Sequence, residues 1–260
     1  MINLLRADLY RLFRSKALYI CTFISIIFAL LNVLIIKYTY SSVSMLGMYS
    51  FMISKLSAVW MIENFSSNVS LFIAIFIAIF ITSEFTFQTI KNITSRGFSR
   101  EKIYASKYIS SCIASLIIFF LSFISVIILS TIMWGFGTIP DKFAINLLCM
   151  LALQVLYLIS LTSIFTMIAF LVRNNGGAIS INIIIVFLSK ILIELVSLLL
   201  YRIIKKEIDI TKYWLLAYEE IFSSLSFEKD VVIRGIIVCL SFLVVAFVIG
   251  VVTFKKRDIN

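Results

Sequence analysis

Long apolar runs separated by short polar segments dominate the hydropathy pattern of this chain. Most of these runs reach the ~20 residues that a helix needs to cross the hydrocarbon core of a bilayer. The pattern therefore predicts an all-α, polytopic membrane protein with six transmembrane helices in a single domain, residues 1–260. The predicted spans cover residues 17–36, 65–83, 108–134, 143–172, 178–201 and 231–254.

The segment before the first span, residues 1–16, has the pattern of an amphipathic helix. Its apolar face holds Leu4, Leu5, Leu9, Leu12 and Phe13, and its basic residues are Arg6, Arg11, Arg14 and Lys16. Such a helix suits the surface of a membrane, where basic side chains reach the head groups. The alternative is a positively charged flank that only orients the first span.

Residues 84–107, between the second and third spans, form the most cationic segment in the first three quarters of the chain. The segment holds Lys91, Arg96, Arg100, Lys102 and Lys107 against only Glu84 and Glu101. Phe85, Phe87, Ile90 and Ile93 fit one apolar helical face, Gly97 supplies a break, and a second helical pattern begins at Ser99. We interpret the segment as a docking element between two membrane helices; the alternative is an orienting loop without a partner.

The distribution of charge predicts which side of the membrane each loop faces. With both termini inside, the interior segments hold thirteen basic against four acidic residues, and the exterior segments nine against eight. Basic residues favour the cytoplasmic side. The sequence thus predicts a plasma-membrane protein with both termini in the cytoplasm. The exterior segment 202–230 carries several aromatic residues, so we expect short helices at the membrane interface there.

Composition narrows the classes of function. The chain is 62% hydrophobic and only 14% charged, so it is solvated mostly by lipid. It has no His, which argues against a metal centre and against His-dependent catalysis. The four cysteines show no paired spacing, and no Gly-rich ATP-binding loop is present. We therefore expect no catalytic, cofactor-binding or metal site in this chain, and no nucleic-acid partner.

Two polar groupings lie within the predicted spans. Lys190 and Glu194 are four residues apart and can pair on one helix face, which Ser197 and Tyr201 extend. Such a pair lines a substrate path or subunit interface, or it is a structural pair that holds the span against its neighbours. Gln154 is costly to leave unpaired in lipid and is expected to point inward.

The layout of the whole chain resembles the permease subunit of a type-2 ABC exporter. The sharpest local match is the run from Glu84 through Thr89 and Lys91 to Ser99, Arg100 and Lys107. It is similar to the family segment that forms a coupling helix in the groove of the ATPase. The resemblance implies that the residues contacting the ATPase are Glu84, Lys91, Arg96, Gly97, Phe98, Ser99, Arg100, Glu101, Lys102, Tyr104 and Lys107. Phe98 and Tyr104 would be the apolar anchors, and an acidic cleft would be expected on the partner.

The same resemblance implies the partners. ATP and Mg²⁺ would be bound by a separate ATPase subunit, and this chain would pair with a second permease copy or a paralogue. Small permeases of this type resemble exporters of amphipathic, antimicrobial or cytolytic peptides and their immunity counterparts, such as exporters of lantibiotics and phenol-soluble-modulin-like peptides. Other hydrophobic substrates such as drugs or lipids are an alternative. An ion-driven secondary transporter is a further one, although it would need broken helices and several buried ionisable sites.

Overall fold

The computed structural model describes residues 2–44, 56–65, 69–139, 142–204, 210–225 and 228–256, and within these ranges the chain is helical with no strand. The elements in chain order are α1 (Ile2–Arg14), α2 (Lys16–Ser44), α4 (Ala58–Glu63), α5 (Val69–Thr86), α6 (Thr89–Ser95), α7 (Arg100–Trp134), α8 (Phe143–Val172), α9 (Asn175–Ile204), η1 (Ile210–Tyr213), η2 (Leu215–Ala217), α10 (Tyr218–Ile221) and α11 (Lys229–Lys256).

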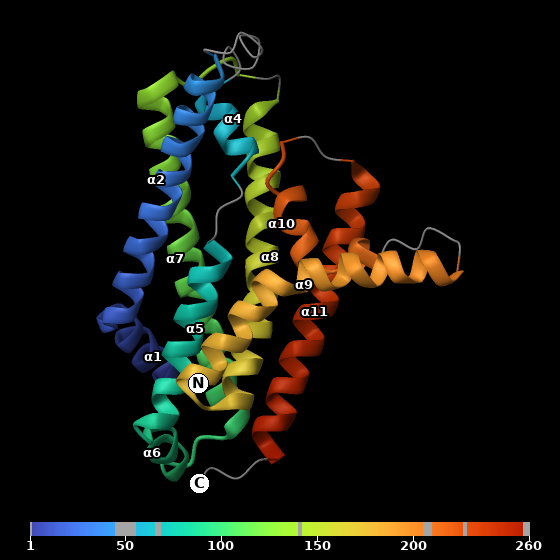
Figure 1. Cartoon of the computed structure of the whole chain (residues 1–260). Coiled ribbons are helices and arrows are strands. Elements are labelled where there is room, and N and C mark those ends of the chain that lie inside the picture. Colours follow the sequence, from blue (N-terminus) through green and yellow to red (C-terminus); the bar gives the residue numbers. More distant parts are fainter. Residues whose placement is uncertain are drawn as a thin grey trace.

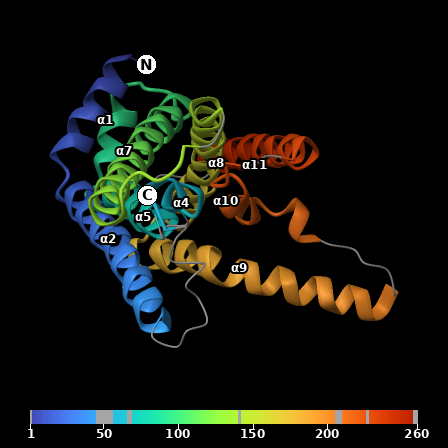
Figure 2. The same cartoon turned by 90° about the horizontal axis from the view of Figure 1, so that it is seen from above.

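The long helices form a bundle in which α5 and α8 are the inner members. About two thirds of the apolar window of each is buried (67%), against 28% for α2 and for α11. Helix α2 packs on α7, α11 packs on α8, and α5 contacts both α8 and α9 (Figures 1 and 2). We call the end of the bundle that holds α1, α6 and the last turn of α11 the tip end, and the opposite end the far end (Figure 1).

Five helices are long and apolar enough to cross a membrane: α2, α5, α7, α8 and α11. The bounds of α8 are those predicted from the sequence, Phe143–Val172. Helix α7 differs, because it begins at Arg100 and not at residue 108, so the polar start of this segment already belongs to the long helix. These helices confirm an all-helical membrane protein.

The fifth predicted span, residues 178–201, corresponds to α9, and the structure does not confirm it as a straight span. The helix is bent by 47° between the parts Asn175–Ser189 and Ile191–Leu199. The first part lies against α5, and the second projects sideways from the bundle (Figures 1 and 2). Hydropathy counts the apolar residues of a run but carries no information about its direction, which is why the sequence missed this bend.

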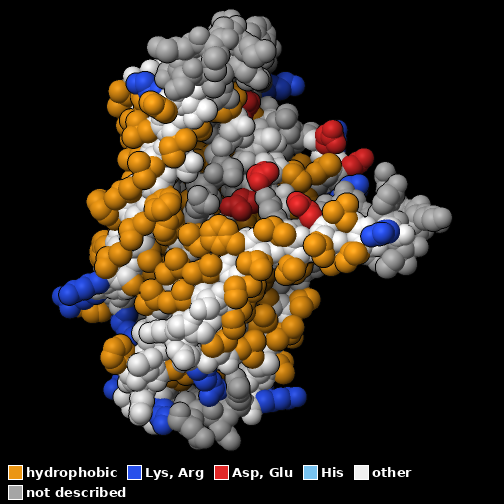
Figure 3. Space-filling model, viewed as in Figure 1, with side chains coloured by type: hydrophobic (Ala, Val, Ile, Leu, Met, Phe, Trp, Pro, Cys, Tyr) orange, Lys and Arg blue, Asp and Glu red, His pale blue; other side chains and the backbone are white. Residues whose placement is uncertain are grey.

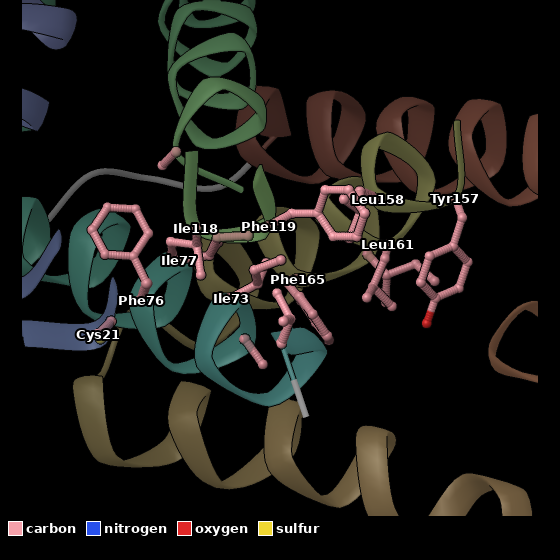
Figure 4. Packing of buried hydrophobic residues seen from close by; sticks show 14 of the residues in the cluster. Cys21, Ile73, Phe76, Ile77, Ile118, Phe119, Tyr157, Leu158, Leu161 and Phe165 are labelled. Carbon is pink, nitrogen blue, oxygen red and sulfur yellow. The ribbon is translucent and has the colours of Figure 1, made fainter. Parts of the chain in front are cut away.

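The core lies where α5, α7 and α8 meet. Ile73 and Ile77 of α5 lie beside Ile118 and Phe119 of α7 and near side chains of α8 (Figure 4). The α8 side chains at this junction include Leu158, Leu161 and Phe165. Small residues let the backbones approach: Ala74 and Ala78 of α5 are fully buried.

Polar side chains also join neighbouring helices inside the bundle. Ser122 of α7 is 2.7 Å from Ser25 of α2, and Ser115 of α7 is 2.9 Å from Thr162 of α8. Asn182 of α9 donates from Nδ2 to the carbonyl of Ala74 at 3.1 Å. These bonds satisfy buried polar groups and fix the relative heights of the helices.

Aromatic side chains hold α11 against the rest of the bundle at the tip end. Tyr104 of α7 lies between Phe170 of α8 and Phe247 of α11, with ring centroids 4.7 and 5.4 Å away. Phe254 contacts both Phe170 and Phe85. We call these five residues, Phe85, Tyr104, Phe170, Phe247 and Phe254, the aromatic brace.

Gly250 of α11 is required by the aromatic brace. A Cβ at this position would lie 2.8 Å from Cε2 of Tyr104 and closer still to its hydroxyl. We expect Gly250→Ala to destabilise the protein by about 1–3 kcal/mol, because the ring is fully buried and cannot withdraw. Unfolding in detergent measures the change.

A double-mutant cycle separates this clash from other effects of the substitution. Tyr104→Ala removes the ring, so the cost of Gly250→Ala in that background should be smaller than in the wild type. Equal costs in the two backgrounds would show that the close approach of Gly250 and Tyr104 does not set the stability.

Candidate functional site

The segment between α5 and α7 forms a compact turn of helix at the tip end. Gln88 adopts a left-handed conformation (φ 54°) that ends the extension of α5, and α6 follows from Thr89 to Ser95. Gly97 (φ 83°) then turns the chain into α7, as the sequence predicted for this glycine. The hydroxyl of Thr89 donates to the carbonyl of Glu84 at 3.2 Å, so it caps the last turn of α5. We call residues 87–102 the tip.

The exposed surface of the tip is cationic with one large apolar side chain. Arg96 and Lys102 are exposed, whereas Lys91 and Arg100 are half-buried. Phe87 is 74% exposed, more than any other phenylalanine that the structure describes. Figure 3 shows Lys and Arg side chains around this end of the molecule and others toward the far end, where the Asp and Glu side chains visible in this view also lie.

Phe87 was missed as a contact residue because its place in a helical pattern suggested an apolar face. In the structure it lies in the turn between α5 and α6, outside both helices. Its neighbours in that pattern do turn inward: Ile90 is buried and Phe85 joins the aromatic brace. The sequence offered no signal for this exposed position, because glutamine is not a residue type that marks a left-handed helix end.

Both predicted anchors, Phe98 and Tyr104, and the predicted contact residue Arg100 take part in packing or bonding within the chain. Tyr104 is fully buried in the aromatic brace, and Phe98 is half-buried against the core, so Tyr104 cannot enter a groove on a partner. Arg100 donates from Nη1 to the carbonyls of Phe254 and Lys255 at 3.3 and 3.0 Å. These are terminal carbonyls of α11, and Arg100 therefore caps that helix.

A second contact joins the tip to α11. Nζ of Lys255 donates to Oε1 of Glu101 at 2.8 Å between exposed side chains. With Arg100, this bond ties the first turn of α7 to the last turn of α11. The tip is consequently attached to two transmembrane helices through its backbone, α5 and α7, and to a third through side chains.

Behind the tip lies a buried ion cluster formed by three helices. Nζ of Lys107 on α7 donates to both Asp8 of α1 and Glu84 of α5. Ser106 donates to the other oxygen of Asp8, and Arg11 reaches Oε1 of Glu84 at 2.8 Å. Asp8, Glu84 and Lys107 are almost completely buried, while Arg11 is 39% exposed. Two acids and two bases leave the buried ion cluster neutral.

The buried ion cluster changes the roles of Glu84 and Lys107. Both were predicted to contact a partner, but each is 0% exposed, so neither can lie on a docking surface. Their place within α5 and α7 explains the difference, since the segment predicted as a loop from 84 to 107 is helical at both its ends. Glu84 and Lys107 therefore stabilise the helices that carry the tip and do not form its surface.

Helix α1 has the predicted position in sequence but a different apolar face. Leu4, Asp8 and Leu12 are its buried residues, while Phe13 is half exposed. Residues four apart share a helix face, so the spacing of Leu4, Asp8 and Leu12 was a signal that Asp8 points toward the protein. Helix α1 therefore packs against α7 through an apolar stripe that contains one carboxylate.

The structure describes the side chains of three of the residues predicted for a pathway or interface, Gln154, Glu194 and Ser197. Gln154 is buried in α8, as expected, and donates to the carbonyl of Glu219 at 3.0 Å. Glu194 is exposed on the outer part of α9, and Ser197 donates to the carbonyl of Ile193 within that helix. The side chains of Lys190 and Tyr201 lie outside the described residues.

The start of α5 makes a polar contact with α10 that the sequence did not predict (Figure 1). Ser70 of α5 donates to Oε1 of Glu219 at 2.6 Å, so this acid joins α5 to α10. The predicted short helices of this segment are confirmed as η1, η2 and α10. Tyr218 and Phe222 are buried against α11 near Gly235, however, and among the described aromatic residues of 202–230 only Tyr213 is largely exposed.

The chemistry available in the described residues is structural and electrostatic. No group of three or more His, Cys, Asp or Glu within them could hold a metal ion. The cysteines are free, two of them buried. The tip, with the buried ion cluster and the aromatic brace behind it, is thus the arrangement best suited to function, as a stiff cationic surface at one end of a membrane bundle.

Comparison with known proteins places this bundle in a family. Residues 60–260 match the model of a family described as a protein of unknown function, DUF2705, and the chain therefore belongs to that family. The matched range includes the tip and α5 to α11, whereas α1 and α2 precede it. No curated protein matches the chain.

Proposed function

We propose that this DUF2705 chain is the transmembrane permease subunit of an ATP-driven ABC exporter, with its tip in the cytoplasm as the docking surface for a separate ATPase subunit. ATP and Mg²⁺ would be bound and ATP hydrolysed by that subunit, and the permease itself is not an enzyme. The single observation that carries the proposal is the exposed cationic tip, which is built stiffly onto the membrane helices. The permease motif around Glu84, Thr89 and Arg100 adds to this support.

The mechanical argument begins with α7. Its 35 residues correspond to about 50 Å at 1.5 Å per residue. This exceeds the ~30 Å of the hydrocarbon core, so the helix can reach from the tip across the membrane without a break. A displacement of the tip by a partner would therefore move α7 as a rigid body. The buried ion cluster would carry the movement to α1 and α5, and Arg100 and Lys255 would carry it to α11.

The surface of the tip fits a partner groove with acidic edges. Phe87 is the one large apolar side chain of residues 87–102 that is largely exposed, and Arg96 and Lys102 are exposed cations of the same segment. Protein interfaces commonly combine a buried apolar anchor with a polar rim. Four basic residues against one acidic residue within the tip favour an electronegative partner.

The orientation of the chain follows from its charges. Both termini and the tip are placed in the cytoplasm, because the basic residues are concentrated in these segments. The proposed location is the plasma membrane. In this arrangement α9 completes the set of six membrane segments as the fifth in chain order, with its first part beside α5. Its outer part carries exposed apolar side chains, including Ile191 and Leu198, which a second permease copy or a paralogue would cover.

The proposed cargo is an amphipathic peptide of the antimicrobial or cytolytic kind, following the sequence resemblance, and the biological role is export or immunity. Such a peptide partitions into the bilayer, and a permease with large apolar surfaces could receive it from there. A drug or a lipid remains the alternative cargo. Cells lacking the chain should become sensitive to added peptide if the peptide is the cargo.

One observation favours a second candidate function. The 47° bend in α9 resembles the broken helices around which ion-driven transporters build their sites. The two candidates differ in their need for ATP. Charge reversal at the tip should stop an ATP-driven exporter and leave an ion-driven carrier working.

Co-purification tests the proposed function directly. The full chain, expressed from its native locus and isolated from membranes, should bring an ATPase subunit with it. The complex should hydrolyse ATP faster than the ATPase alone, because docking couples the two subunits. Isolation of the chain without any nucleotide-binding subunit would contradict the proposal.

A further inference from the structure

A groove of about 270 Å³ opens between the N-terminal helix and α5, beside the buried ion cluster. One wall comes from the end of α1 and the break that follows it, with Tyr10, Arg11, Arg14 and Ser15. The other wall comes from the last turns of α5, with Ile79, Phe80 and Ser83. The groove therefore combines two arginines and three hydroxyl groups with an apolar surface.

The two arginines give the groove a net positive charge. Arg11 is bound to Glu84 within the neutral buried ion cluster, but its side chain is 39% exposed and one side of it remains accessible. Arg14 lies outside that cluster and is exposed. Its guanidinium carbon is 5.0 Å from the ring centroid of Tyr10, which holds it at the mouth of the groove. Arginine pairs well with phosphate because its planar fork can donate two parallel hydrogen bonds.

We infer that this groove binds the head group of an anionic phospholipid. The occupant is a lipid and not a free phosphate, because the polar groups adjoin an apolar surface of membrane-helix length. Ser15 lines the groove immediately before α2 begins at Lys16, and Tyr19 lies in the first turn of that helix. Tyr19, Ile20 and Phe23 are all more than half exposed, and they offer a surface for the acyl chains. The inference is independent of the proposed transport function.

Lipid binding would also affect the packing of α1 against α5, through Arg11. Its guanidinium would lie between Glu84 and the lipid phosphate, so that an anion at the surface is linked to the buried carboxylate. The lipid would thereby help to hold α1 against α5 at the level of the tip. Anionic lipid should consequently raise the melting temperature of the full chain more than neutral lipid does.

Native mass spectrometry of the full chain in detergent can test the inference, with phosphatidylglycerol and phosphatidylcholine of the same acyl chains as probes. Phosphatidylglycerol should bind more tightly, and Arg14→Gln should weaken it by about fivefold, the effect typical of one basic residue near an anionic lipid surface. Ser83→Leu fills the groove without changing charge and should weaken binding as well. Lys16→Gln removes the same charge from an exposed residue that does not line the groove, and it should have little effect.

Three results would overturn the inference. Equal binding of the two lipids would remove the role of charge. An equal loss in Arg14→Gln and Lys16→Gln would show a diffuse charge effect without a site. Displacement of phosphatidylglycerol by millimolar inorganic phosphate would show a site for the free anion and not for a lipid. Arg14 and Lys16 are exposed, so both variants should keep the wild-type melting temperature without lipid, which checks that they are folded.

Discussion

Replacing Lys107 by methionine is expected to destabilise the protein by about 3–5 kcal/mol, the largest effect among our predictions. Lys107 is fully buried and pairs with both Asp8 and Glu84. Without it, the cluster keeps two acids and only Arg11, which contacts Glu84 from the partly exposed edge. Asp8 would be left as a buried carboxylate without its cation, and this is costly in a site closed to water. Denaturant or thermal unfolding in detergent measures the loss.

Two further variants make this result specific. Lys102→Met removes a cation from the same helix at an exposed position, and its effect should stay within about 0.5 kcal/mol. Adding Asp8→Asn to Lys107→Met removes the stranded acid and leaves the Glu84–Arg11 pair, so the double variant should recover part of the stability. A cost for Lys107→Met no larger than that for Lys102→Met would refute the buried ion cluster as a structural joint.

Removing the Phe87 side chain is expected to weaken docking of the ATPase by about 30-fold, or about 2 kcal/mol, as for a central interface residue. Phe87 does not support the fold, since it is 74% exposed in the turn after α5. The variant should therefore remain stable while ATP hydrolysis loses its stimulation by the permease. Titration of the purified ATPase against the full chain measures the change in affinity.

Reversing the charge of the tip should affect docking in a different way from removing the Phe87 side chain. Arg96→Glu and Lys102→Glu reverse exposed charges, so they should slow association and make it less sensitive to salt. Phe136→Ala and Lys229→Glu are matched controls in the part of the chain away from the tip, and they should leave docking unchanged. Equal losses in the tip variants and in these controls would show that the tip has no special role.

The sequence predicted much of the local structure because local patterns determine it. The lengths of the apolar runs predicted the five long helices, and for α8 they predicted both ends. Gly97 was identified as a break because glycine tolerates a positive φ, and the structure has φ 83° there. These features depend on neighbouring residues, which a sequence displays directly.

The buried ion cluster could not be predicted in the same way. Lys107 contacts an acid 99 residues away and another 23 residues away, and each charge seen alone resembles a surface residue. Only the spacing of Leu4, Asp8 and Leu12 hinted that one acid faces the interior. The assignment of Glu84 and Lys107 to a docking surface followed from their place in a motif, and the motif does not distinguish contact residues from supporting ones.

The same limit explains Tyr104 and Phe87. Both are aromatic residues in one cationic segment, and sequence alone favoured Tyr104 as an anchor. Helix α7 already begins at Arg100, so Tyr104 is a helical residue and its ring points toward Phe170 and Gly250. Phe87 is left outside because α5 ends just before it. Which aromatic projects therefore depends on helix ends, the least predictable feature of a helical sequence.

The most direct test of the central claim is site-specific cross-linking from the tip in living cells. A benzophenone side chain in place of Phe87 should, on irradiation, form an adduct with a nucleotide-binding subunit at the cytoplasmic face. The same group in place of Phe136, in the part of the bundle away from the tip, should give no such adduct. If position 87 is instead labelled by impermeant reagents from outside the cell, or forms no adduct with an ATPase, the tip is not a docking surface and the proposed function is wrong.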